Sequence, residues 1–316
     1  MDAPTPLPEF LREPPERSRR AEDPGVRIHA FDPVTRSCPT CPDFEGLHLL
    51  EDLLSEEEAD RLLAVIDREP FQPAQSGKEK QHFGARVNFN KRKVNANAFE
   101  GLPGYAAWLE TRTRERWARE SREPDEARRR GAHRPGLVRA LSAFRTTDVF
   151  VLRYRSAERS NLDFHVDDRF AYGEAILALS LESDGVMTFL RPGASDRPGW
   201  DCVRVALPTR SMSILYGPAR YEWEHAILSH DVQGRRTSIS LRTLSEPLRR
   251  TAVGRVILER AGRRWERCAE AEGASEQGDA GTGSRSASSD SPHSSAPSAA
   301  IARRGSMGSG GASDPS

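Results

Sequence analysis

Eight short apolar runs follow one another between residues 144 and 247, and they constrain the fold more than any other feature. They are rich in β-branched and aromatic residues, and Gly, Pro or Asp separates them: DVFVLRY, DFHVD, AILALSLES, VMTFLRP, CVRVALP, SMSILYG, HAIL and RRTSISLRT. Strands at this spacing without helices between them predict a sandwich or jelly roll rather than a parallel α/β sheet. We therefore expect a mainly β fold with flanking helices around a double-stranded β-helix, or jelly-roll, core.

Two helices are expected ahead of these strands, over residues 55–68 and 104–119. Ser55 is a candidate N-cap, and Glu58 three residues later completes a capping-box pattern. Because the helices precede the strands, we expect them to buttress one face of the sheet.

The two ends of the chain lack the residues that build a core. Residues 1–37 hold seven prolines, and residues 269–316 contain no Phe, Trp, Tyr, Leu or Val. Such segments bury too little apolar surface to offset the entropy lost on ordering. We predict a disordered segment over 1–37, one folded domain over 38–265 with its jelly-roll core at 144–247, and a disordered tail over 266–316.

Composition narrows the class of protein. Lys and Arg number 47, as do Asp and Glu, which excludes a uniformly basic nucleic-acid coat. No secretory signal or membrane-spanning run is visible, and four scattered cysteines indicate a reducing compartment. Cys38 and Cys41 have the spacing of half a zinc site, but Cys202 and Cys268 stand alone, so zinc binding stays open.

Three histidines and one aspartate are candidates for a metal site. In a strand, His165 and Asp167 point to the same face, although such a tripeptide is also a common polar strand end. His225 can complete a site of two histidines and one carboxylate, an arrangement typical of Fe(II) oxygenases, and His230 is the competing candidate.

The last strand pattern, RRTSISLRT, has two chemically different faces. Arg236, Ser238, Ser240 and Arg242 face one way, and Thr237, Ile239, Leu241 and Thr243 face the other. If the arginine face is interior, two buried guanidinium groups require anionic partners, which a dicarboxylate ligand can supply. The alternative is an exposed strand with its polar side in water.

These motifs, in this order, resemble the AlkB family of Fe(II)/2-oxoglutarate dioxygenases. The similarity covers about residues 38–247, and the segments that carry it most resemble the fourth AlkB homolog subfamily: QSGKEKQHFGARVNFNKRK, DFHVDDRFAYGEAILALSLES, ARYEWEHAI and RRTSISLRTLS. The resemblance implies Fe(II), 2-oxoglutarate as cosubstrate and O₂.

The resemblance also implies a function for individual residues. His165, Asp167 and His225 would bind Fe(II), and Arg236 would pair with the distal carboxylate of 2-oxoglutarate. Arg242 would hold the end of the cosubstrate nearer the metal, or buttress the aspartate.

Tyr154 matches the tyrosine that hydrogen-bonds the cosubstrate in the family. Many members have Asn two residues earlier, where this chain has Leu152, so one cosubstrate contact differs. Tyr172 and Trp223 are candidate walls of the substrate pocket, and Asp168 is a candidate neighbour of the substrate.

Basic and aromatic residues alternate over residues 76–93, where relatives carry a substrate lid. The predicted lid residues are Lys78, Phe83, Arg86, Phe89 and Lys91. Such a surface can contact phosphates and stack a base. The alternative is a solvated hairpin in which the two phenylalanines anchor the core.

The resemblance implies oxidative N-demethylation, with release of succinate, CO₂ and formaldehyde. Expected substrates, and hence partners, are N6-methyladenine in DNA or a monomethylated lysine of actin, and the sequence does not choose between them. Two alternatives remain: a catalytically silent jelly roll that binds actin–myosin or chromatin proteins, and a hydroxylase on the same scaffold. The expected location is the cytoplasm and nucleus, with no membrane association.

Overall fold

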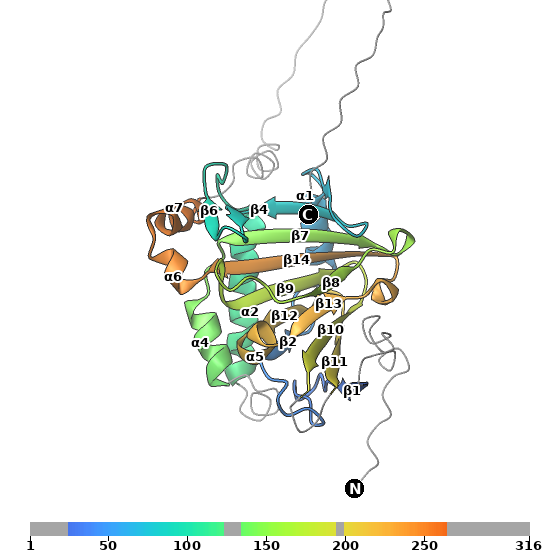
Figure 1. The fold of residues 1–316 in the computed structure, drawn as a ribbon. Helices are drawn as coiled ribbons and strands as arrows, with labels where there is room; N and C mark the ends of the chain where they lie inside the picture. The colour runs from blue at the N-terminus through green and yellow to red at the C-terminus, as the bar shows by residue number, and fades with distance from the viewer. Residues whose placement is uncertain (1–24, 123–133, 194–198, 264–316) are drawn as a thin grey trace, which may run out of the picture. The chain divides into compact units, whose positions relative to one another are not determined.

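Two β-sheets form the centre of the protein (Figure 1). The structure, a computed structural model, describes residues 25–122, 134–193 and 199–263, all within one compact unit, Met1–Ser275. The five-stranded sheet has the order β1 (Val26–Ala30), β11 (Trp200–Leu207), β10 (Gly185–Pro192), β13 (Glu224–Ile227), β8 (Leu162–His165). The seven-stranded sheet has the order β2 (Leu47–Leu50), β12 (Met212–Leu215), β9 (Tyr172–Leu181), β14 (Arg235–Leu244), β7 (Asp148–Arg155), β4 (Glu79–Phe83), β3 (Gln72–Pro73).

The jelly-roll prediction is confirmed. Each of the eight predicted runs contains a strand, and β7 to β14 divide between the two sheets. Pairing among these eight is antiparallel, and β14 lies between β7 and β9. One short helix, α5 (Gly217–Tyr221), interrupts the run of strands between β12 and β13.

The N-terminal boundary predicted at residue 37 is wrong. Residues 26–30 form β1, which pairs in parallel with β11 at the edge of the five-stranded sheet. The alternation in VRIHA fits a half-buried strand, but the surrounding prolines and charges hid it. The rest of the predicted N-terminal segment, residues 1–24, and the predicted tail lie outside the described residues.

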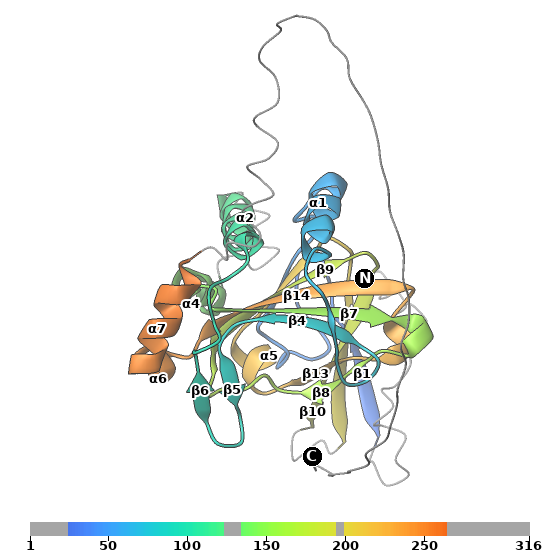
Figure 2. The same ribbon diagram turned by 90° about the horizontal axis from the view of Figure 1, so that it is seen from above.

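Helices cover the outer face of the seven-stranded sheet. In Figure 2, α1 and α2 lie on one side of β4, β7 and β14, while β8 and β13 lie on the other. The helices are α1 (Glu56–Ile66), α2 (Gly104–Arg122), α4 (Pro135–Ala143), α6 (Glu246–Arg249) and α7 (Ala252–Ala261), the last three of which were not predicted. Among the described residues, no helix is long and apolar enough to cross a bilayer.

Two apolar clusters separate the layers. Ile239 and Leu241 of β14 pack into the cluster beneath the helices, together with Leu62 of α1 and Leu109 of α2. The second cluster includes Phe189, Val203 and other inward-facing residues of the five-stranded sheet. The side of β14 that does not join the helix-covered core therefore faces the space between the sheets.

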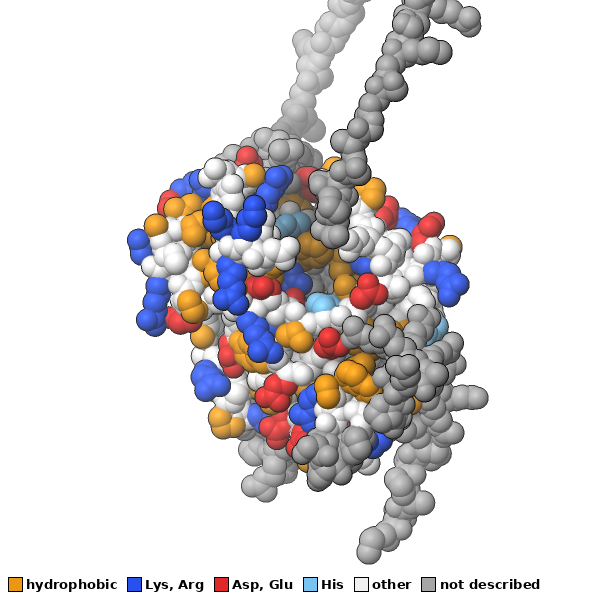
Figure 3. Space-filling view, in the orientation of Figure 1, with side chains coloured by type: hydrophobic (Ala, Val, Ile, Leu, Met, Phe, Trp, Pro, Cys, Tyr) orange, Lys and Arg blue, Asp and Glu red, His pale blue; other side chains and the backbone are white. Residues whose placement is uncertain are grey.

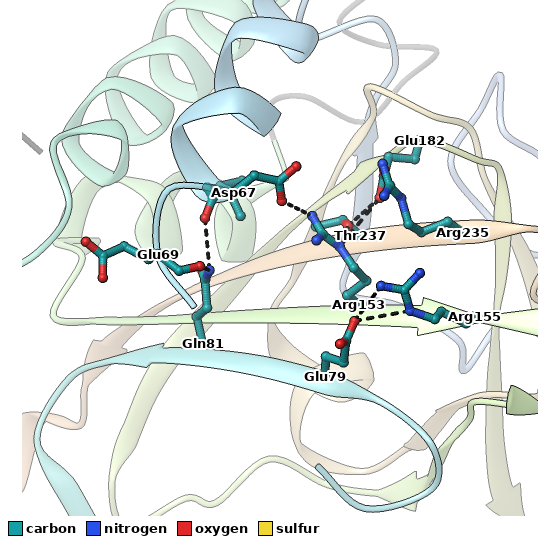
Figure 4. A network of polar contacts seen from close by, with 10 residues as sticks. Asp67, Glu69, Glu79, Gln81, Arg153, Arg155, Glu182, Arg235 and Thr237 are labelled. Atoms are coloured by element: carbon teal, nitrogen blue, oxygen red, sulfur yellow. Dashed lines mark hydrogen bonds and ion pairs between the residues drawn. The ribbon is translucent and has the colours of Figure 1, made fainter. Parts of the chain in front are cut away.

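The capping box predicted for α1 is present, and its C-terminal end is tied to the sheet. Ser55 accepts the Glu58 N–H, and the Glu58 side chain accepts the Ser55 N–H. At the other end, Gln81 of β4 donates to the carbonyls of Ile66 and Glu69 (Figure 4).

Beside Gln81, the buried side chain of Arg153 donates to Asp67 and to Thr237. Figure 4 shows this network running from the end of α1 across β7 to β14. Polar contacts thus bind the helix layer to the strands that face the interior.

Replacing Gln81 with alanine should weaken this junction. The Gln81→Ala variant removes the side-chain donor from both carbonyls, of which Ile66 keeps the Glu69 N–H, so the free energy of unfolding should fall by about 1–3 kcal/mol. Urea denaturation measures this change. Gln72→Ala, at an exposed position of β3, is the control and should stay within about 0.5 kcal/mol of wild type. Equal losses in both variants would contradict the assignment.

Candidate functional site

Two histidines and one aspartate meet between the sheets. His165 ends β8 and lies opposite His225 of the paired strand β13. Asp167 follows two residues after the strand has ended, and its side chain still turns toward the imidazoles. Their ligand atoms all lie within 4.8 Å of one another, and Asp167 Oδ2 is 3.4 Å from His225 Nε2. The competing His230 lies in a short helical turn and is not part of this group.

The surroundings favour the protonation states that a metal requires. Burial opposes charge on Asp167, yet the Arg242 guanidinium and the imidazoles hold the pKa of Asp167 well below its usual range. Burial, followed by the neighbouring His225, lowers the pKa of His165. An ionised carboxylate beside neutral imidazoles is the form in which these side chains bind metals.

The donor set fits Fe(II). The Nδ1 of His165 lies 2.8 Å from the Asp163 carbonyl, which can accept the ring N–H and leave Nε2 for a metal. Two imidazoles and one carboxylate occupy one side of an octahedral ion and leave the other side open for further ligands.

A cavity of about 470 Å³ opens onto this group, and Arg236 lies in its wall. The Arg236 side chain is 2% exposed and donates through Nη2 to Ser180 Oγ. Its Nε and Nη1 have no hydrogen-bond partner among the described residues. A buried guanidinium with unused donors is a ready acceptor site for a carboxylate.

Tyr154 and Gly185 frame this guanidinium. The Tyr154 ring lies 5.4 Å from the guanidinium carbon, and burial raises the pKa of its hydroxyl to about 12, so the hydroxyl stays a donor. A Cβ built at Gly185 would lie 2.6 Å from Arg236 Nε, so only glycine leaves room for the side chain there. Gly185 and Ser180 could not be predicted from the sequence, because neither residue type carries a signal for a neighbour on another strand.

Arg242 buttresses the aspartate, the second of its two predicted functions. Its Nη2 lies 3.0 Å from Asp167 Oδ1, and its Nη1 lies 3.4 Å from Asp148 Oδ1. Asp148 in turn accepts from His82 Nε2 at 2.6 Å, if that ring nitrogen carries the proton. With two carboxylates already beside it, Arg242 is not the free cation that a further anion needs. Asp148 and His82 are additional site neighbours that the sequence did not indicate.

The predicted lid residues divide between a strand of the sheet and an exposed hairpin. Lys78 is 7% exposed and donates to the Asn161 carbonyl, and Phe83 packs against the core, so neither faces a substrate. Both lie next to or in β4, a strand that pairs with β7 and therefore belongs to the sheet.

The hairpin of β5 (Arg86–Asn88) and β6 (Lys93–Asn95) carries the exposed part of the predicted lid. Phe89, at its tip, is half exposed, lines the cavity and lies 6.5 Å from the Tyr172 ring. Lys91 is exposed in the same turn. Figure 3 shows a hollow in this face with Lys and Arg side chains gathered beside it.

The remaining pocket predictions divide. Tyr172 and Asp168 line the cavity, as does Leu152. Trp223 does not: it is fully buried against Phe44 and under the Arg191 guanidinium.

Comparison with known proteins identifies the family of this chain. Residues 46–258 match the model of the 2OG-Fe(II) oxygenase superfamily. The human alpha-ketoglutarate-dependent dioxygenase alkB homolog 4 is 30% identical over 64% of this chain and 68% of its own length. A DNA N6-methyl adenine demethylase of Caenorhabditis elegans is 28% identical over 70% of this chain and 66% of its length. The solved structure of OsALKBH1 aligns over 63% of this chain and 98% of its own at 11% identity, with a TM-score of 0.41.

Asp167→Asn should abolish Fe(II) binding while the fold is retained. A neutral amide is a poor metal ligand, but its oxygen can still accept from Arg242. We expect Fe(II) affinity to fall by about 100-fold or more, measured by anaerobic metal titration, with an unchanged circular dichroism spectrum. Asp168→Asn is the control, since that carboxylate instead accepts the Ala171 N–H. Wild-type Fe(II) affinity in Asp167→Asn would place the metal elsewhere.

Arg236→Ala should weaken 2-oxoglutarate binding. Truncating one member of a buried charge pair costs about 2–5 kcal/mol, which corresponds to a Kd raised by about 30-fold or more. Calorimetric titration of the metal-loaded protein measures it. The control is Arg235→Ala, since the neighbouring Arg235 is exposed and pairs with Glu182. Equal affinity in the two variants would exclude the Arg236 pocket as the cosubstrate site.

Proposed function

The chain belongs to the 2OG-Fe(II) oxygenase superfamily and is a 2-oxoglutarate-dependent dioxygenase, and we propose that its reaction is oxidative N-demethylation. The observation that carries the proposal is one cavity that joins the His165–Asp167–His225 group to the unused donors of Arg236. A silent binding module has no use for a buried cation and a ligand group in one cavity.

The residues of the cavity divide the work of binding and positioning. When bound, Fe(II) supplies the oxidation of an N-methyl group by O₂, coupled to conversion of 2-oxoglutarate to succinate and CO₂. Arg236 would bind the distal carboxylate of 2-oxoglutarate, and the Tyr154 hydroxyl would donate a hydrogen bond to the cosubstrate. Arg242 keeps Asp167 ionised and oriented. The hydroxylated methyl group then leaves as formaldehyde.

The hairpin beside the cavity favours methylated DNA as the substrate. Four exposed cationic side chains lie along β5, the turn and β6: Arg86, Lys91, Arg92 and Lys93. Cations of this kind bind phosphates, and the exposed ring of Phe89 at the mouth can stack on a base turned out of the helix. We therefore assign N6-methyladenine in DNA as the substrate, a choice that the name of the nematode relative supports.

A monomethylated lysine of actin is the second candidate. The cavity walls include Leu152, Ile176 and Met187, and apolar walls of this kind suit the alkyl stem of a lysine. Both substrates present an N-methyl group, on the exocyclic nitrogen of a base or at the end of an alkyl side chain. DNA and chromatin proteins would place the protein in the nucleus, and actin–myosin would place it in the cytoplasm.

A turnover panel tests the reaction and its substrate together. The full chain, loaded with Fe(II) and 2-oxoglutarate, is offered DNA with N6-methyladenine, methylated RNA and an actin peptide with monomethyl-lysine. We expect formaldehyde and succinate in equal amounts with the DNA, and neither product with Asp167→Asn. Succinate above the substrate-free level, formed without formaldehyde, would indicate a hydroxylase, and formaldehyde from the peptide alone would replace DNA with actin.

Phe89→Ala should impair DNA turnover through the loss of stacking. An aromatic side chain stacked on a base contributes about 1–3 kcal/mol, so KM for the DNA should rise by about 5- to 150-fold while uncoupled turnover of 2-oxoglutarate stays the same. Phe89→Trp, which keeps a flat ring, is the control and should retain a low KM. A KM unchanged by Phe89→Ala would remove the ring from the substrate surface.

A further inference from the structure

A second group of metal-ligating side chains lies at the edge of the five-stranded sheet, where β1 pairs with β11. His29, Cys41 and Asp201 each place one ligand atom there, and these atoms lie within 4.8 Å of one another. All three side chains are buried, and Asp201 is fully so. None of them lines the cavity of the oxygenase site.

The parallel register of β1 and β11 brings two of these residues together. Arg27 lies opposite Asp201, and His29 lies opposite Val203, so their side chains project from one face of the sheet. His29 Nε2 is 3.1 Å from Asp201 Oδ1. From typical bond lengths, two ligands of one tetrahedral zinc ion are separated by about 3.4 Å, so this spacing already suits a shared ion.

A tight turn places a second cysteine, Cys38, next to this group. The Cys41 N–H donates to the Cys38 carbonyl at 3.0 Å, and the Cys38 thiol donates to the Ala30 carbonyl at 3.1 Å. Both side chains are at most 3% exposed. Two cysteines separated by two residues in such a turn present their sulfur atoms to one ion, as in structural zinc sites.

We propose that His29, Cys41 and Asp201 bind one Zn²⁺ ion and that Cys38 supplies the fourth ligand by turning its sulfur atom from the Ala30 carbonyl toward the ion. Thiolate and imidazole ligands select zinc over the hard cations Mg²⁺ and Ca²⁺, and four protein ligands close a tetrahedral structural site. The sequence showed only half of this site, because the other two ligands stand 9 residues before Cys38 and 160 residues after Cys41.

Neighbouring groups complete the surroundings that such an ion needs. Two thiolates and one carboxylate exceed the charge of Zn²⁺ by one, and Arg27 donates to Asp201 Oδ1 at 2.8 Å to balance it. The Thr40 hydroxyl oxygen lies 3.3 Å from His29 Nδ1 and can accept a hydrogen bond from a protonated Nδ1, which leaves Nε2 for the metal.

The ion would fasten the start of the folded chain to the sheet that carries the oxygenase ligands. From β1 the hydrogen-bonded order runs through β11 and β10 to β13, which carries His225, and β8, which carries His165. Zinc at the outer edge of this sheet would link β1 and the cysteine turn, which are close in sequence, to β11, which is far from both. Its contribution is therefore to stability rather than to the oxidation.

Metal content separates this site from the oxygenase site. The full chain carrying Asp167→Asn is purified under reducing conditions, equilibrated with ZnCl₂, freed of excess metal and analysed by inductively coupled plasma mass spectrometry. We expect about one zinc per chain, and less than about a tenth of that when Cys38→Ser and Cys41→Ser are added. Cys202→Ala, a buried cysteine on the other face of β11, is the control and should keep the zinc.

Two measurements on the chain with all its cysteines keep the proposal testable if the double variant does not fold. Titration with a mercurial reagent should release the zinc as two thiols react, followed with a colorimetric zinc indicator. Co²⁺ in place of zinc should give thiolate-to-cobalt charge-transfer absorption. The proposal would be overturned by less than about a tenth of a zinc ion per chain, or by zinc that is retained in the folded double variant. It would also be overturned by bound cobalt without that absorption, or by a Cys38–Cys41 disulfide that persists after purification under reducing conditions.

Discussion

Buried cations between two sheets are the constraint on which the rest of this protein depends. Arg236 and Arg242 project from the inner side of β14 into a space whose other walls are largely apolar. A charge in such a place is stable only beside an anion or a dense set of acceptors. Arg242 has Asp167 and Asp148, whereas Arg236 has one serine hydroxyl and a tyrosine ring. This difference separates a cation that orients a metal ligand from a cation that awaits a carboxylate.

One strand serves two surfaces because its side chains alternate. Ile239 and Leu241 hold β14 to the helix-covered core, and Arg236 and Arg242, which flank them on the alternate face, are thereby fixed toward the cavity. That alternation is local, so the sequence alone predicted it, together with the eight strands and the capped first helix. The metal-ligand group could be proposed for the same reason: His165 and Asp167 are close in sequence, and a distant histidine needed only one pairing, β8 with β13.

What the sequence could not predict depends on register between distant segments. Gly185 matters because β10 passes against Arg236, and Asp148 matters because β7 pairs with β14. Trp223 was misplaced because Phe44 and Arg191, which enclose its ring, come from distant segments of the chain. Lys78 was predicted to lie in a lid that contacts phosphates, but it directly precedes β4, and its ammonium group donates to the Asn161 carbonyl. The sequence shows the chemistry of each of these side chains, but their contacts depend on which distant segments the fold brings together.

The two candidate metal groups lie at opposite ends of the five-stranded sheet and are built in the same way. Each combines a pair of residues close in sequence, His165 with Asp167 or Cys38 with Cys41, with ligands that only strand pairing supplies. The nitrogen and oxygen group opens onto a cavity, as a site that must admit reactants requires. The sulfur-containing group is closed by its own turn and lines no cavity described for the oxygenase site. Ligand chemistry and solvent access therefore vary together: the open site suits Fe(II) and its cosubstrate, and the closed one suits a structural ion.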